Sequence, residues 1–135
     1  MQANPQSEVD MGKYVDGFVL VVPTGKTEAY KQMATIGRDA WMKHGALSYY
    51  ECRADDLKPQ EMGDEKTVAF DAMAGAQADE TVWFSFIVFE SKEHRDEVNA
   101  KVMAEMSEDT TMTEASMPMD MKRMAYGGFA VEVEG

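Results

Sequence analysis

The pattern of apolar and polar positions predicts two strand–helix units in this chain. Residues 82–89 are a nearly continuous apolar, β-branched and aromatic run, which is typical of a strand covered on both faces. Ser91 follows as a helix N-cap with Glu93 in the first turn, and apolar residues recur at helical spacing as far as Met106. A similar unit occupies residues 14–44. The two units indicate a duplicated half-domain.

Turn residues and weaker alternations place the other elements. Pro23 ends the first strand, Thr27 is expected to cap the first helix, and Gly45 is expected to stop it. Residues 1–12 are polar and are predicted to form a disordered leader before a single domain over residues 13–135. The expected strands are 14–22, 46–54, 82–89 and 126–134, with a short edge strand over 67–70, and the expected helices are 27–43 and 92–106.

The order of these elements predicts an α+β fold. It is a ferredoxin-like βαββαβ domain, with an antiparallel sheet whose helices cover one face only. In the last strand, Phe129, Val131 and Val133 are expected to face the core. Large apolar residues occur on both alternations of the third strand, with Trp83 on one and Phe84 on the other. A monomer would leave such a face in water, so we expect a two-fold homodimer.

Composition excludes several classes of protein. The chain has 135 residues, with 25 acidic and 13 basic residues and a net charge of −12, whereas a nucleic-acid binder needs a basic face. Cys52 is the only cysteine, so an internal disulfide is impossible. The start of the chain lacks the pattern of a signal peptide, and the longest apolar runs are shorter than a membrane span. A cytoplasmic protein without nucleic-acid or membrane partners is expected.

Four ordered segments carry a resemblance: YVDGFVLVVP (14–23), HGALSYYEC (44–52), WFSFIVFESKEHRDEVNAKVM (83–103) and KRMAYGGF (122–129). Together they are similar to the YbaA-like family of bacterial proteins of unknown function. That family belongs to the dimeric α/β-barrel superfamily, whose members include antibiotic-biosynthesis monooxygenases, haem-degrading enzymes and small isomerases. The resemblance implies a dimer with a cavity between sheet and helices, and it transfers no activity. Met119 departs from the family pattern, which has an aromatic residue after the proline.

Three residues are candidates for catalysis. His44, at a helix C-terminus, suits a general base or a ligand, or simply a favourable charge near the helix dipole. His94, in the first turn of its helix, suits an acid–base role or a solvated surface position. Arg95 suits recognition of an anion or carbonyl, or an architectural network. The two histidines have no metal-site spacing, so neither a metal nor a cofactor is expected.

The architectural interpretation of Arg95 leads to a specific expectation. Arg95 and Asn99 share a helix face with Val102, so their polar groups should be partly buried. A buried arginine needs a carboxylate partner. The acidic residues on neighbouring strands are Glu51 and Asp16.

Sulfur-containing residues raise a further alternative. The chain has 13 methionines, concentrated in residues 103–124, and Met117, Met119 and Met121 form a thioether set that suits copper(I). Adaptable packing explains the same residues and is favoured. Cys52 alternates with Tyr50 on a strand and is expected to be a buried, inert thiol.

Taken together, the sequence predicts a cofactor-free protein that binds or transforms a small molecule in a cavity between the sheet and its helices. The alternative is a non-catalytic interaction module in which the same residues are structural, and a copper(I) protein is the weaker alternative. Residues expected to line the cavity are His44, Tyr50, Trp83, Phe84, Arg95, Asn99 and Tyr126.

Overall fold

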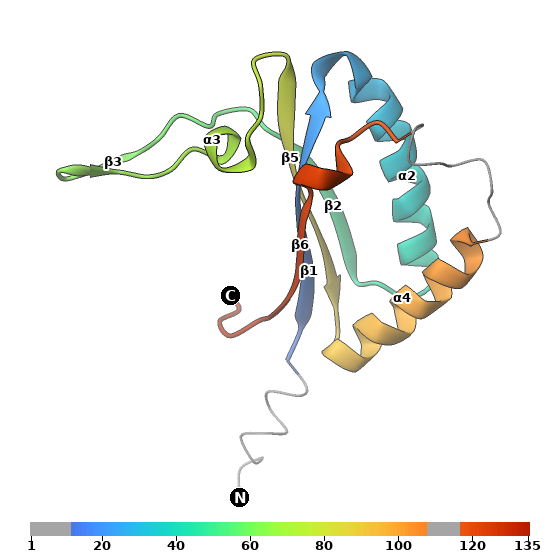
Figure 1. Cartoon of the computed structure of the whole chain (residues 1–135). Helices are drawn as coiled ribbons and strands as arrows, with labels where there is room; N and C mark the ends of the chain where they lie inside the picture. Colours follow the sequence, from blue (N-terminus) through green and yellow to red (C-terminus); the bar gives the residue numbers. More distant parts are fainter. Residues whose placement is uncertain (1–11, 108–116) are drawn as a thin grey trace, which may run out of the picture.

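The computed structural model describes residues 12–107 and 117–135. They form an α+β fold in which four antiparallel strands make one sheet, and the long helices α2 and α4 cover one of its faces (Figure 1). The strand order across this sheet is β2-β5-β1-β6. The elements are β1 (Tyr14–Pro23), η1 (Thr24–Lys26), α2 (Thr27–Lys43), β2 (Ser48–Arg53), β3 (Glu61–Met62), β4 (Glu65–Lys66), α3 (Phe70–Ala74), β5 (Glu80–Phe89), α4 (Lys92–Met106), η3 (Met121–Arg123) and β6 (Ala125–Ala130).

The core lies between the sheet and the two long helices. Strand β5 pairs with β1 on one edge and β2 on the other, so its backbone groups are satisfied from both sides. Trp83 of β5 is buried with Tyr30 of α2, while Ile87 and Phe89 are buried with Val98 of α4. The apolar run over residues 82–89 therefore forms the expected central strand.

The helix ends follow the sequence signals with one exception. The Ser91 hydroxyl accepts a hydrogen bond from the His94 backbone N–H, which confirms Ser91 as the N-cap of α4. Gly45 has a φ of +113° directly after α2, which confirms it as the helix stop. The prediction that Thr27 caps α2 is wrong, because the turn η1 precedes the helix and the Thr27 hydroxyl donates to the Thr24 carbonyl at 2.8 Å.

The connection between β2 and β5 lies on the other side of the sheet. It carries the hairpin of β3 and β4 and the short helix α3, and Figure 1 shows it projecting away from the face that α2 and α4 cover. The edge strand predicted for residues 67–70 is wrong, because Phe70 begins α3. The Phe70 ring lies 6.4 Å from that of Phe84, so α3 packs on the sheet face opposite the long helices.

This opposite face is apolar and largely open. We define the open face by Tyr50, Phe84, Phe86 and Phe129, of which Tyr50, Phe84 and Phe129 are 53%, 45% and 61% exposed. The Tyr50 and Phe86 rings stack with their centroids 5.0 Å apart. Cys52 lies on the same edge strand as Tyr50 and is exposed, so its predicted burial is wrong.

The last strand is shorter than the alternation predicted. Strand β6 ends at Ala130, and Val133 beyond it is 91% exposed. Phe129 pairs with Val15 on the open face and is exposed as well, so the prediction that it faces the core is wrong. An alternating pattern identifies two faces of a strand but does not tell which of them the helices cover.

Two predicted features fall on residues outside the described part of the chain. The expected leader occupies residues 1–12, of which 1–11 are not described. In the methionine-rich segment, residues 108–116 are likewise outside it, and the described part contains the turn η3.

Candidate functional site

A cavity of about 730 Å³ lies between helix α2 and the sheet. We call it the sheet–helix cavity. Its wall is mainly aromatic and thioether: it includes the rings of Phe18, Tyr30, Trp41 and Tyr49 together with Met33, Met106, Met117, Met119 and Met124. Small-molecule sites have volumes of roughly 300–1,000 Å³ and apolar walls with a few polar groups. The sheet–helix cavity matches this description.

One carboxylate forms the polar centre of the cavity wall. Glu51 Oε1 accepts hydrogen bonds from the Tyr30 hydroxyl at 2.7 Å and from the Ser85 hydroxyl, while its Oε2 accepts one from the Tyr49 hydroxyl at 2.6 Å. We call these four residues the Glu51 cluster, and all four line the cavity. They come from α2, β2 and β5, so tertiary packing brings them together.

Both tyrosines of the cluster remain protonated donors at any physiological pH. Burial, reinforced by the charge of Glu51 and the hydrogen bond to it, raises the pKa of Tyr30 well above its usual range. The pKa of Tyr49 is raised as well, first by burial and then by its hydrogen bond to Glu51. Hydroxyl donors stabilise a carboxylate in its charged form. The cluster is therefore suited to holding a negative charge in place.

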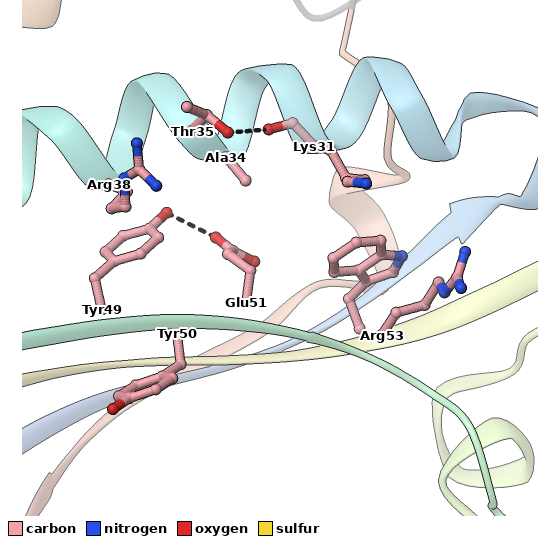
Figure 2. A pocket seen from close by; sticks show the side chains of 9 residues that line it. Lys31, Ala34, Thr35, Arg38, Tyr49, Tyr50, Glu51 and Arg53 are labelled. Carbon is pink, nitrogen blue, oxygen red and sulfur yellow. Dashed lines mark hydrogen bonds between the residues drawn. The ribbon is translucent and has the colours of Figure 1, made fainter.

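A second depression of about 450 Å³ lies on the solvent side of this cluster. We call it the basic groove, because Lys31 and Arg38 of α2 and Arg53 of β2 line it. Figure 2 shows Tyr49 and Glu51 pointing from the strand toward α2, with Tyr50 directed to the opposite side of the sheet. Tyr49 and Glu51 line both spaces, so this hydrogen-bonded pair lies between the groove and the cavity.

A separate polar network joins the N-terminal half of α4 to the sheet. Arg95 Nη1 donates to Asp16 Oδ1 at 2.7 Å and to the Tyr126 hydroxyl at 2.9 Å. Asn99 Nδ2 donates to Asp16 Oδ2 at 3.3 Å, and Trp41 Nε1 donates to Asn99 Oδ1 at 2.9 Å. Asp16 is 1% exposed, so the network supplies its buried carboxylate with a cationic partner, Arg95. The expected distant carboxylate partner of Arg95 is confirmed as Asp16, and Arg95 Nε also donates to the adjacent Asp96 Oδ1 at 2.8 Å.

The structure distributes the seven residues predicted for the cavity over separate places. Arg95, Asn99 and Tyr126 are brought together in the network around Asp16. Tyr50 and Phe84 lie on the open face, whereas their neighbours Tyr49 and Trp83 face the helices. Trp83 lines the basic groove, and its indole N–H is buried without a hydrogen-bond partner among the described residues. None of the seven is among the residues that line the sheet–helix cavity.

The two histidines lie at helix ends. His44 is the C-cap of α2, and its Nε2 lies 3.0 Å from Glu105 Oε1, which also accepts from Lys43. His94 Nδ1 accepts the Glu90 backbone N–H at 3.0 Å. Each imidazole is thus engaged with its own neighbourhood, and the structure does not bring His44 or His94 to the Glu51 cluster.

Sequence reasoning identified Glu51 only as a possible partner of Arg95. The signal for the cluster is the alternation of Tyr49 and Glu51 on β2, which directs both side chains to the same face. Ser85 lies directly opposite Glu51 in the pairing of β2 with β5. That pairing joins residues 34 positions apart, so it requires the strand register as well as the pattern.

The described residues contain neither a cluster of metal-binding side chains nor a helix that could span a membrane. Within residues 12–107 and 117–135, no three His, Cys, Asp or Glu side chains are grouped so that they could hold a metal ion. Across the same residues, no helix combines the length and apolar character needed to cross a membrane.

The family described as "Protein of unknown function (DUF1428)" matches residues 13–121. The chain belongs to this family. It is also 44% identical over 119 residues to the "Uncharacterized protein YbaA" of Escherichia coli strain K12, an alignment that covers 87% of this chain and 94% of the relative. A protein with the same description from Shigella flexneri has the same identity and coverage. The predicted resemblance to the YbaA-like family is confirmed.

Membership of the DUF1428 family names no activity, and the matched region contains the whole Glu51 cluster. It also contains the network around Asp16 except for Tyr126. The geometry of these two groups and of the cavity therefore carries the functional assignment.

Proposed function

We propose that this DUF1428 protein binds a small molecule in the sheet–helix cavity, without a cofactor. The observation that carries the proposal is the Glu51 cluster, which presents an oriented carboxylate in the mainly apolar wall of a cavity of about 730 Å³. Fixed polar groups in an apolar cavity give a ligand both orientation and specificity. Three hydroxyl donors already hold the carboxylate, so no rotamer search is needed when a ligand arrives.

Recognition is favoured over acid–base catalysis by the same contacts. A general base works best when its charged form is poised to take a proton. The hydroxyls of Tyr30, Tyr49 and Ser85 instead hold the carboxylate in one orientation through three hydrogen bonds. Glu51 is therefore assigned as a binding group, and no catalytic residue is proposed.

Filling the cavity tests this proposal. A Met33→Trp substitution places a larger side chain in the cavity wall, whereas Met42→Trp makes the same change at an exposed position of α2 that is not among the lining residues. In a fragment screen followed by NMR, wild type and Met42→Trp should share binders whose shifts centre on the cavity. Met33→Trp should lose them. Binding that persists in Met33→Trp, or shifts centred on the open face, would count against the cavity.

The open face supports a second proposal, that the domain is ferredoxin-like and pairs as a dimeric α/β barrel. The order β2-β5-β1-β6, with β3, β4 and α3 inserted between β2 and β5, fits a βαββαβ arrangement. Exposed aromatic rings on the sheet face opposite α2 and α4 are suited to burial against a second copy. In this arrangement the interaction surface and the ligand cavity occupy opposite faces of the sheet.

The methionines contribute to the cavity wall rather than to a copper site in this proposal. Met119 and Met124 pack against the buried cluster of Leu20, Val22 and Trp83. A flexible thioether side chain fills irregular space next to such a cluster. Met119 therefore supplies part of the apolar wall of the cavity.

A further inference from the structure

The charges around the sheet–helix cavity indicate what kind of ligand it takes. Among the described residues that line it, the only carboxylates are Glu51 and Glu105, and no lysine, arginine or histidine lines it. Glu105 accepts from Lys43 at 2.8 Å and lies 3.0 Å from the ring of His44, so its charge has partners outside the cavity. Glu51 is different, since its hydrogen-bond partners are three neutral hydroxyls.

Glu51 has three hydroxyl hydrogen-bond donors but no cationic partner among the described residues. Within the described part of the chain, no basic side chain forms an ion pair with Glu51, although Arg38 pairs with Asp39 and Arg95 with Asp16. Burying an ionised carboxylate is costly unless it is paired, and a ligand cation next to it recovers much of that cost. Among the described residues, Glu51 Oε2 accepts from Tyr49 only, which leaves this oxygen able to accept a further hydrogen bond from a ligand.

The remainder of the wall suits a positively charged ligand with an apolar body. The rings of Phe18, Tyr30, Trp41 and Tyr49 line the cavity. An aromatic face attracts an ammonium group within about 6 Å of its centroid. The methionine side chains and Ile87 provide polarisable apolar contact for the rest of the ligand.

The cations of the basic groove do not change the expected preference of the cavity for a positively charged ligand. Lys31, Arg38 and Arg53 lie on the solvent side of the Tyr49–Glu51 pair, where Lys31 also has Glu28 at 3.6 Å and Arg38 has Asp39 at 2.9 Å. Charges at exposed positions are strongly screened by water and salt. An anionic ligand inside the cavity would meet the Glu51 carboxylate first, and like charges in a low-dielectric space repel strongly.

We infer that the ligand of the sheet–helix cavity is a primary or secondary amine with an aromatic or branched apolar body, whose ammonium group binds Glu51 Oε2. This inference rests on the proposed function, because it assigns a chemical class to the ligand of the same cavity. It adds a prediction that the cavity alone does not make, namely selection by charge among molecules of the same shape.

Three compounds with one ring and similar length test the selection: phenethylamine, phenethyl alcohol and phenylacetate. Their affinities for wild type should be measured by calorimetry at neutral pH and low salt. We expect phenethylamine to bind about tenfold more tightly than the alcohol, the scale of one charge-assisted hydrogen bond, and phenylacetate to bind most weakly. In Glu51→Gln the amine and the alcohol should bind within about twofold of each other. Glu28→Gln is the matched control, because Glu28 is an exposed glutamate of α2 that is not among the lining residues, and it should keep the preference of wild type.

The results distinguish a failure of the inference about the ligand's charge from a failure of the proposed function. An alcohol or acid that binds the wild-type cavity as tightly as the amine overturns the inference while leaving the proposed function intact. Failure of all three compounds to bind also overturns the inference, and the Met33→Trp comparison then decides the proposed function separately. If Glu51→Gln does not fold, a co-crystal of wild type with phenethylamine replaces it. A nitrogen at hydrogen-bond distance from Glu51 supports the inference, and a nitrogen elsewhere contradicts it.

Discussion

Replacing Arg95 with alanine should destabilise the fold strongly, because it leaves Asp16 buried without its cation. Asp16 is 1% exposed and accepts from Arg95 Nη1 at 2.7 Å, whereas its hydrogen bond from Asn99 is longer, at 3.3 Å. Removing one partner of a buried ion pair costs about 3–5 kcal/mol. For a domain of this size the loss corresponds to a fall in Tm of about 10–20 °C.

Urea unfolding followed by circular dichroism measures this free energy directly. Arg38→Ala provides the control, since Arg38 is exposed and pairs with its neighbour Asp39, and surface pairs contribute about 0–1 kcal/mol. The double variant Arg95→Ala/Asp16→Asn removes the buried charge as well, so it should be more stable than Arg95→Ala alone. A double variant that is equally unstable would refute the reasoning, because the unpaired carboxylate would then not be the cause.

Three further predictions concern acid stability, assembly and metal content. The hydrogen bond from Arg123 lowers the pKa of Glu80 from 4.5 to about 2, so the stabilisation from this pair is present above pH 4.5 and is lost as pH falls toward 2. Between pH 5 and pH 2, Tm should fall less in Arg123→Ala than in wild type, and an equal fall would contradict the assignment. Light scattering should give twice the chain mass of 15.1 kDa for wild type and a smaller mass for Phe84→Asp, whereas a monomeric wild type would exclude pairing through the open face. Elemental analysis should show no stoichiometric zinc, iron or copper, and one copper per chain that disappears when Met117, Met119 and Met121 are replaced together would restore the copper alternative.

The central strand and the burial of Arg95 against a distant carboxylate could be predicted from simple rules, although the sequence left both Glu51 and Asp16 open as that partner. A continuous apolar run followed by an N-cap serine specifies β5 and the start of α4 whatever the rest of the chain does. The pairing of Arg95 follows from the cost of a buried cation, which requires an acid on a neighbouring strand.

The candidate site could not be assembled in the same way. Trp83 and Phe84 were both expected in one cavity, yet adjacent strand residues point to opposite faces. Tyr30 reaches Glu51 across 21 positions in the chain, and only the packing of α2 on the sheet brings them together. The exposure of Phe129 shows a related limit, because the side of an edge strand that the helices cover depends on the whole sheet.

A co-crystal of wild type grown with a mixture of small amines, alcohols and acids would show directly whether the sheet–helix cavity binds a ligand. We expect one ordered molecule in the cavity, with a polar group at hydrogen-bond distance from Glu51 and its apolar part between α2 and the sheet. A cavity filled by side chains of the protein itself would refute ligand binding there. Ligands bound only at the open face or in the basic groove would refute it as well.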